Sequence, residues 1–339
     1  MAERSDRRGF LNQGLLGAAG AAAALSLEER ILLAALQEGT TQKPNTGPQD
    51  DRPMPYGQIR NLKISRMLIG GNLIGGWAHS RDLLYVSRLF KAYNTDDRIF
   101  ETLALCESLG INTVQLDPAC INVFHRYLTE RGGKMQALVC IHPDADAGKV
   151  RSEIEGLLNK GATFLYTHGE VTDRHTMNGR LDILAKTMEL VKEAGVPAGI
   201  GSHSLETPMQ CEAQNVGAEF YVKTFHQDNY WSATLPEKRQ EWCWYLPRGE
   251  EPGTYHDNMW CLDPGKTAEF FKTVKKPWFA FKVMAAGAIH PRMAFPYALR
   301  NGADFLIVGM FDFQVAEDVA IFKDAYYKLG NQRQREWYA

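Results

Sequence analysis

Residues 135–168 read MQALVCIHPDADAGKVRSEIEGLLNKGATFLYTH, and they contain the unit that the rest of the chain repeats. The apolar run 135–141 predicts a buried strand, and the pattern of 147–160 predicts a helix. Gly161 supplies the left-handed end of that helix, and the apolar run 163–167 then predicts a second strand. Apolar strands that alternate with helices are typical of a parallel sheet covered on both faces.

The same unit recurs along the chain after residue 57. Strands are predicted at 67–69, 113–116, 135–141, 163–167, 198–201, 220–224, 278–284 and 305–308. Helices are predicted at 96–109, 121–131, 147–160, 178–194, 206–217, 265–275, 291–302 and 315–328. Eight strand–helix units over about 280 residues predict an α/β fold, a (β/α)₈ TIM barrel. A doubly wound open sheet is the alternative, but its glycine-rich turn needs the order GxGxxG, which residues 70–76 (GGNLIGG) lack.

The amino-acid composition and net charge of the chain limit the classes of function that fit it. The 339 residues carry a net charge of −2, which favours neither nucleic acid nor an anionic membrane as the main partner. The hydrophobic share of 45% is enough for a large core. Six cysteines without a CxxC pair do not indicate a disulfide-built fold.

The first 24 residues resemble a twin-arginine (Tat) signal. Arg7 and Arg8 precede an apolar stretch that is rich in Ala, Gly and Leu, and small residues end it at 22–24. The resemblance implies export through the Tat machinery to the periplasm or beyond, without a stable membrane anchor. A buried amino-terminal helix is the alternative interpretation. We expect 1–24 as the signal, 25–57 as a linker and 58–339 as the barrel domain.

Histidines close four consecutive predicted strands. These are His142, His168, His203 and His226. Strand ends in a barrel converge on one small volume, and imidazole is a common metal ligand. The pattern predicts a divalent metal site (Zn²⁺, Mn²⁺, Fe²⁺ or Ni²⁺) whose ligands come from these four histidines and Glu170.

Three further side chains are candidates for chemistry at the same ends. Asp117 and Glu170 are candidate general acids or bases, and Lys282 is a candidate electrostatic aid. Lys223 is a candidate substrate-binding residue. Strand alternation decides whether each lysine faces the barrel interior, and the sequence favours this for Lys282 while leaving Lys223 open.

Two segments are longer than a barrel needs, and both follow strand ends. They are 77–94 and the insertion 227–263 after the sixth strand. The insertion contains four of the seven tryptophans, and Trp231, Trp242 and Trp244 are candidates for stacking on sugar rings. The alternative is a self-packed loop or a subunit interface.

Residues 64–72 (ISRMLIGGN) and 100–114 (FETLALCESLGINTV) are similar to the opening of the aldo/keto reductases. This resemblance implies the same (β/α)₈ barrel and an NADP(H) cofactor. It also implies that Asp117 and His168 occupy the positions of the family's Asp and His. The family's tyrosine and strand-three lysine have no match, because Ile141-His142 stands where the lysine is expected.

These observations support three hypotheses. The first is an exported, metal-dependent TIM-barrel enzyme that acts on a sugar or related polyhydroxylated small molecule as an isomerase, epimerase, lyase or hydrolase. The second is an NADP(H)-dependent oxidoreductase of the aldo/keto reductase type. The third is a non-catalytic sugar-binding barrel. The sequence leaves the substrate, the reaction class and the oligomeric state open.

Overall fold

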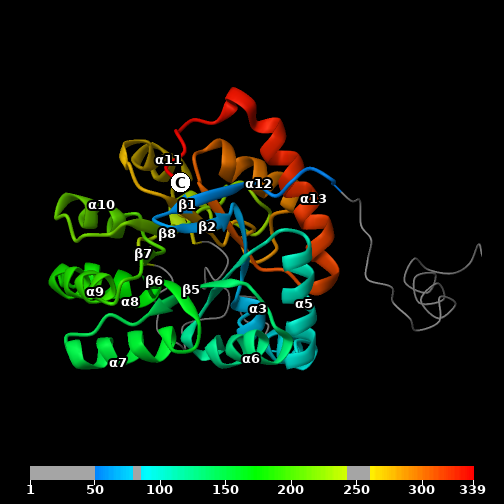
Figure 1. The fold of residues 1–339 in the computed structure, drawn as a ribbon. Coiled ribbons are helices and arrows are strands. Elements are labelled where there is room, and N and C mark those ends of the chain that lie inside the picture. The colour runs from blue at the N-terminus through cyan, green and yellow to red at the C-terminus, as the bar shows by residue number, and fades with distance from the viewer. Residues whose placement is uncertain (1–49, 79–84, 243–259) are drawn as a thin grey trace, which may run out of the picture. The chain divides into compact units, whose positions relative to one another are not determined.

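Eight parallel strands close into a barrel in the computed structural model, which describes residues 50–78, 85–242 and 260–339 (Figure 1). Each strand pairs with its neighbours in chain order, and the last pairs with the first. This confirms the predicted (β/α)₈ barrel and excludes the open sheet. The strands are β3 (Met67–Gly70), β4 (Thr113–Leu116), β5 (Gln136–Ile141), β6 (Ala162–Thr167), β7 (Ala198–Ser202), β8 (Phe220–Thr224), β9 (Trp278–Phe281) and β10 (Phe305–Val308).

A two-stranded antiparallel hairpin precedes the barrel, and the sequence did not reveal it. It consists of β1 (Tyr56–Ile59) and β2 (Leu62–Ser65). Ile59 and Ile64 are buried in the same hydrophobic cluster as residues from inside the barrel. Because β2 leads directly into β3, the hairpin covers the amino-terminal end of the barrel.

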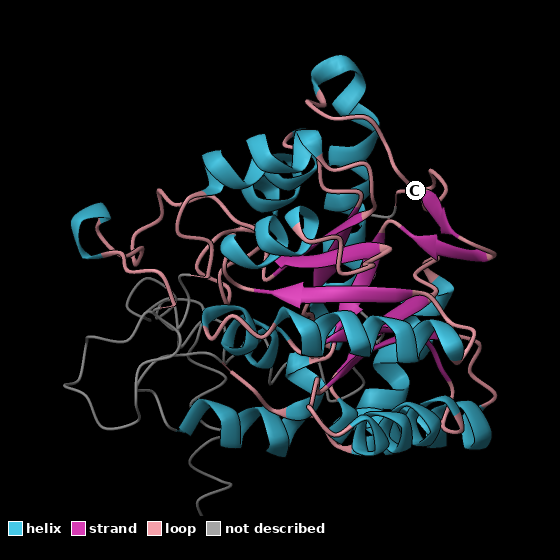
Figure 2. Cartoon of the chain, turned by 90° about the vertical axis from the view of Figure 1, so that its left-hand side faces the viewer, coloured by secondary structure: helices cyan, strands magenta, loops and turns pink. Residues whose placement is uncertain are grey.

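Helices surround the sheet, as Figure 2 shows. Side chains that alternate along each strand build two cores, one inside the barrel and a larger one between the strands and the helices. The helices that follow the strands are α5 (Asp96–Ser108), α6 (Ile121–Arg131), α7 (Ala147–Leu158), α8 (Gly169–Met177), α9 (Leu181–Glu193), α10 (Glu206–Ala213), α11 (Pro264–Thr273), α12 (Pro291–Arg300) and α13 (Asp312–Leu329).

Two regions differ from the prediction. The helix predicted at 178–194 begins later, at α9, and α8 precedes it directly after β6. Gly179 separates the two helices with a φ of 69°, a conformation that glycine adopts without strain. The segment 77–94 contains α4 (Tyr85–Tyr93), and the short helix α3 (Asn72–Gly75) stands before it.

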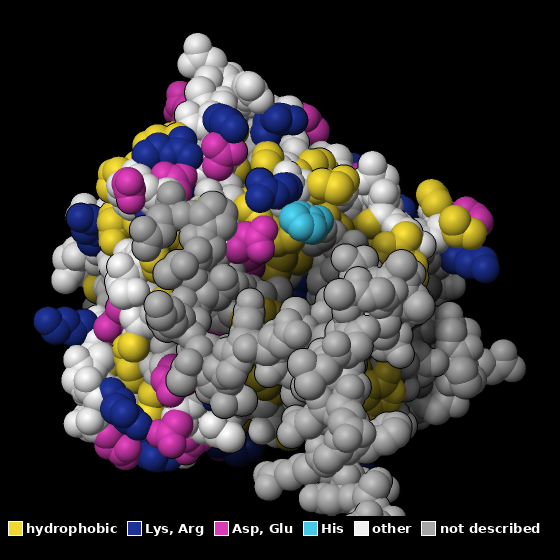
Figure 3. Space-filling model, turned by 90° about the vertical axis from the view of Figure 1, so that its right-hand side faces the viewer, with side chains coloured by type: hydrophobic (Ala, Val, Ile, Leu, Met, Phe, Trp, Pro, Cys, Tyr) yellow, Lys and Arg dark blue, Asp and Glu magenta, His cyan; other side chains and the backbone are white. Residues whose placement is uncertain are grey.

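The predicted signal and most of the predicted linker lie outside the described residues, as does the centre of the insertion 227–263. Within the described part, no helix is long and apolar enough to cross a membrane. Basic and acidic side chains are interspersed on the face that Figure 3 shows, which fits the near-zero net charge.

Candidate active site

A cavity of about 290 Å³ opens at the carboxyl ends of the barrel strands. This is the end at which TIM-barrel enzymes carry their active sites. Its polar and aromatic lining includes Asp117 after β4, Cys140 in β5, His168 after β6, His203 after β7, and Trp260 and Lys282 around β9.

Strand register decides which side chains reach this cavity. Leu116 is paired with Val139 in the β4–β5 ladder, so Asp117 stands level with Cys140. Cys140 is in turn paired with Tyr166 of β6. Because alternate residues face inward, Cys140 and Tyr166 belong to the core inside the barrel. The last inward-facing positions at the carboxyl ends of β4, β5 and β6 therefore lie close together.

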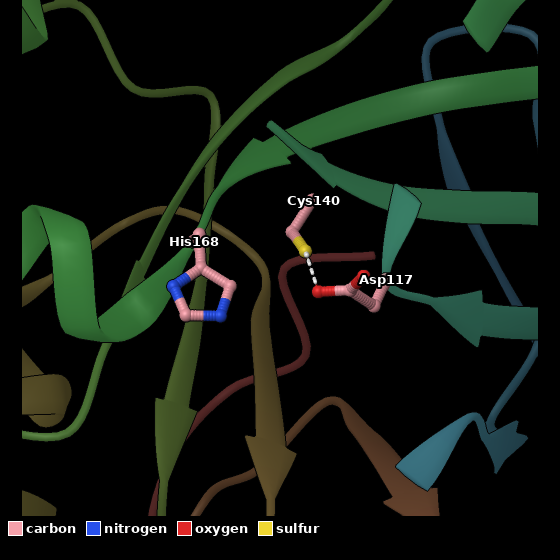
Figure 4. A group of neighbouring side chains, drawn as sticks. All are labelled: Asp117, Cys140 and His168. Atoms are coloured by element: carbon pink, nitrogen blue, oxygen red, sulfur yellow. Dashed lines mark hydrogen bonds between the residues drawn. The ribbon is translucent and has the colours of Figure 1, made fainter. Parts of the chain in front are cut away.

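Asp117, Cys140 and His168 form a compact group at that point (Figure 4). One carboxylate oxygen, the thiol sulfur and one ring nitrogen all lie within 4.8 Å of one another. The Sγ atom of Cys140 lies 3.8 Å from Oδ2 of Asp117. Nδ1 of His168 is buried and makes no hydrogen bond to any described residue. Carboxylate, thiolate and imidazole are all ligands of zinc and of similar divalent ions.

The surroundings of this group are buried and polar. Nε2 of Gln115 donates to the Tyr166 hydroxyl at 2.8 Å. Burial raises the pKa of the Cys140 thiol and of the Tyr166 hydroxyl well above their usual values. Burial also lowers the pKa of His168, and the neighbouring His142 adds to this effect. A positive ion would stabilise the thiolate that the buried site otherwise disfavours.

His142 lies beside the group rather than in the wall of the cavity. Its ring stacks on that of His168, with centroids 5.2 Å apart, and its Nδ1 lies 2.8 Å from Oε1 of Glu153. The Glu153 carboxylate raises the pKa of His142. This arrangement fixes the His142 ring at the exposed rim.

His203 lines the cavity and is held by a buried carboxylate. Oδ2 of Asp173, on α8, lies 2.8 Å from the backbone nitrogen of His203 and 3.0 Å from its Nδ1. The other oxygen accepts a hydrogen bond from Thr207 at 2.8 Å. Burial raises the pKa of Asp173 to about 8, while these hydrogen bonds act in the opposite direction. At Gly169, a Cβ would lie 2.9 Å from Cε1 of His203, so glycine allows α8 to begin against the ring.

Lys282 also lines the cavity, as the sequence favoured. Its Nζ lies over the Trp260 ring, 3.1 Å from the centroid. Its φ of 56° places it in the left-handed region, which costs a residue with a Cβ free energy. Such backbone strain is often found at functional sites.

The structure does not bring Lys223 or His226 to the cavity. Lys223 alternates with the inward Val222, and its buried Nζ donates to the Thr224 carbonyl at 2.7 Å. Nδ1 of His226 lies 2.8 Å from the Gln227 carbonyl, and its Nε2 accepts from the backbone nitrogens of Trp260 and Cys261 at 3.0 and 3.1 Å. Both nitrogens are thus engaged, and we assign His226 a structural role.

The structure describes two of the three tryptophans that were predicted to stack on sugar rings. Trp231 is 88% exposed, and neither Trp231 nor Trp242 is among the residues that line the cavity. Trp244 lies outside the described residues. Trp77 and Trp260 line the cavity instead.

The last of the predicted acids, Glu170, also lines the cavity, and it forms an ion pair with Arg174 one turn along α8. The acidic partner in the Asp117, Cys140 and His168 group is therefore Asp117 rather than Glu170.

Sequence reasoning missed two residues of this site. Cys140 lies inside a predicted strand, two positions before His142, so strand alternation places both on the same face. That signal was available in the sequence. Asp173 lies on α8, which was not predicted, and its contact with His203 spans 30 positions. No local pattern points to it.

Comparisons with known proteins support the fold. No protein-family profile and no curated protein match the chain. Two solved Pseudomonas aeruginosa structures, each named as a candidate aldo-keto reductase, are similar to it. The first is 14% identical with a TM-score of 0.56 and covers 85% of this chain and 99% of its own. The second is 16% identical with a TM-score of 0.55 and covers 81% and 96%. At this identity the likeness shows a shared barrel and nothing finer.

Proposed function

We propose that this barrel is a metal-dependent enzyme, and that Asp117, Cys140 and His168 hold a divalent ion at the carboxyl end of the strands. The observation that carries the proposal is the convergence of these three ligand atoms within 4.8 Å. Three protein ligands with room for an oxygen of water or substrate are typical of catalytic zinc sites. Such an ion would polarise the oxygen of a bound substrate.

The proposed ligand set differs from the four histidines of the sequence hypothesis. His168 is common to both sets. His226 is left out because both its nitrogens already have partners, and His142 is left out because it does not line the cavity. Asp117 and Cys140 replace them. Their mixture of oxygen, sulfur and nitrogen donors favours Zn²⁺ or Fe²⁺ over Mn²⁺.

The proposed substrate is a small polyhydroxylated molecule such as a sugar derivative. The cavity of about 290 Å³ suits a small molecule. Trp77 and Trp260 offer aromatic faces, while Gln115 and Lys282 offer polar groups. Oε1 of Gln115 is buried without a described partner and would accept a hydrogen bond from a substrate hydroxyl.

Metal content tests this proposal. The full chain, purified without an affinity tag, is expected to contain about one equivalent of a divalent metal. The variant His168→Gln is expected to lose most of it, because the imidazole ligand is removed. His125→Gln, on α6 and away from the cavity, is the matched control and should retain the metal. Less than about a tenth of an equivalent in the unmodified protein would contradict the proposal.

An NADP(H)-dependent reductase is the second candidate. The observation in its favour is that Asp117 and His168, which match two of the aldo/keto reductase positions, both line the cavity. The proposal is weaker because Tyr166, the tyrosine among the described residues that line the cavity, donates and accepts within a buried network. Titration with NADPH, followed by its fluorescence, decides: saturable binding supports this candidate, and no change at millimolar NADPH excludes it.

A further inference from the structure

His203 and Asp173 form a second chemical unit in the cavity wall, separate from the three proposed metal ligands. His203 is 8% exposed and Asp173 is fully buried. The two lie on different elements: His203 directly follows β7, and Asp173 is on α8. An acidic side chain at this depth needs several hydrogen-bond donors to remain there. Asp173 has them in the His203 backbone, the His203 ring and Thr207.

This geometry fixes the tautomer of His203. Both oxygens of Asp173 already accept hydrogen bonds, one from the His203 backbone and one from Thr207. Nδ1 of His203 therefore donates to Oδ2, and the neutral ring has its lone pair on Nε2. A carboxyl group behind a histidine ring orients it, and in its ionised form, which Asp173 adopts above a pH of about 8, it stabilises the charged imidazolium that forms when Nε2 takes a proton.

The neighbours of His203 in the cavity provide what a carbonyl substrate needs. The proposed ion lies next to β7, because His168 ends the adjacent strand β6. Lys282 lines the same cavity and carries a positive charge that would offset negative charge on a substrate oxygen. A base beside such groups suits removal of a proton from the carbon next to a carbonyl.

We infer that His203 is the proton-transfer residue of this cavity, that Asp173 is its positioning residue, and that the substrate is a small α-hydroxy carbonyl compound whose C–H proton is moved. This inference rests on the proposed function. Nε2 takes the proton from the carbon that bears the hydroxyl. The C–H electron pair becomes a C=C bond, and the carbonyl π pair moves to its oxygen. His203 returns the proton to the former carbonyl carbon while the hydroxyl proton moves between the two oxygens. The product is an isomer, so no oxidant or reductant is consumed.

Deuterium exchange tests the inference on the full-length, metal-containing protein. The probes are three- to six-carbon aldoses and ketoses in D₂O, observed by ¹H NMR. The unmodified protein is expected to exchange the hydrogen next to the carbonyl in at least one of them. The variant His203→Gln is expected to slow that exchange by about 10²- to 10⁴-fold while it keeps its metal. His125→Gln is the control and should exchange at the unmodified rate.

Asp173→Asn tests the positioning role without deleting the hydrogen bonds. The amide keeps an oxygen for the His203 nitrogens and can donate to Thr207, but it lacks the negative charge that Asp173 carries above a pH of about 8. At about pH 9, where Asp173 is ionised, we expect exchange to slow by at least about 10-fold. We also expect ¹⁵N NMR of labelled histidine to show the Nδ1–H tautomer of His203 in both proteins, whereas the pH–rate profile of exchange should shift to lower pH in the variant, because the imidazolium loses its negative partner. A purely structural Asp173 would leave the pH–rate profile unchanged.

The outcomes separate this inference from the proposed function. Metal without exchange of any probe, or exchange that His203→Gln leaves within about 3-fold, would overturn the inference and leave the metal site standing. An unchanged pH–rate profile and rate in Asp173→Asn would overturn the positioning role. Absence of metal would overturn the proposed function, whatever the exchange result.

Discussion

At the scale of single residues, position relative to the barrel axis decides what a side chain does. His203 and His226 both follow strand ends, and the sequence treats them alike. In the structure, His203 lines the cavity. His226 instead accepts hydrogen bonds from the backbone nitrogens of Trp260 and Cys261. Burial lowers the pKa of His226 to about 4, so its neutral ring accepts both bonds across the neutral pH range.

Removal of this ring is expected to destabilise the fold without affecting the metal. His226→Ala leaves two buried backbone N–H groups without an acceptor, and each such group costs about 1–3 kcal/mol. The free energy of unfolding should fall by about 2–6 kcal/mol in chemical denaturation. His125→Ala is the control. Loss of bound metal with unchanged stability would contradict the structural role and restore His226 as a ligand.

At the scale of elements, helix α13 contains a buried carboxyl that makes stability depend on pH. Asp318 is 4% exposed, and its Oδ2 has no hydrogen-bond partner among the described residues. Burial raises its pKa to about 7, and the neighbouring Glu317 adds to the effect. The folded chain therefore binds this proton more tightly than the unfolded chain does.

The sign of the pH effect follows from that difference. The contribution of protonated Asp318 is fully present below the unfolded pKa of about 3.9. It is lost as the pH rises through about 7. Asp318→Asn should therefore have a higher Tm than the unmodified protein at pH 8.5 and nearly the same Tm at pH 4. The free-energy gain at the higher pH is at most about 4 kcal/mol. Glu155→Gln, an exposed change on α7, is the control. An equal Tm at pH 8.5 would contradict the assignment.

At the scale of the whole molecule, the alternation of apolar strands and helices was sufficient to predict the barrel. All eight predicted strands overlap β3 to β10, because each apolar run is bounded by turn residues or a glycine. The cavity at the carboxyl ends followed from the fold. The group of three proposed metal ligands could not be predicted in the same way, because a shift of one residue along a strand reverses the face on which a side chain lies. Cys140 and Lys223 were both inside predicted strands, and only the ladder register separates the inward thiol from the outward lysine.

The measurement that tests the central claim most directly is the absorption spectrum of the protein loaded with Co²⁺. Cobalt replaces zinc in such sites, and a thiolate ligand gives a charge-transfer band in the near ultraviolet. The account predicts this band in the unmodified protein and in Cys211→Ser, where a buried thiol on α10 outside the cavity is changed. It predicts loss of the band in Cys140→Ser. A band that persists in Cys140→Ser, or its absence from the unmodified protein at saturating Co²⁺, would contradict a metal site at Asp117, Cys140 and His168.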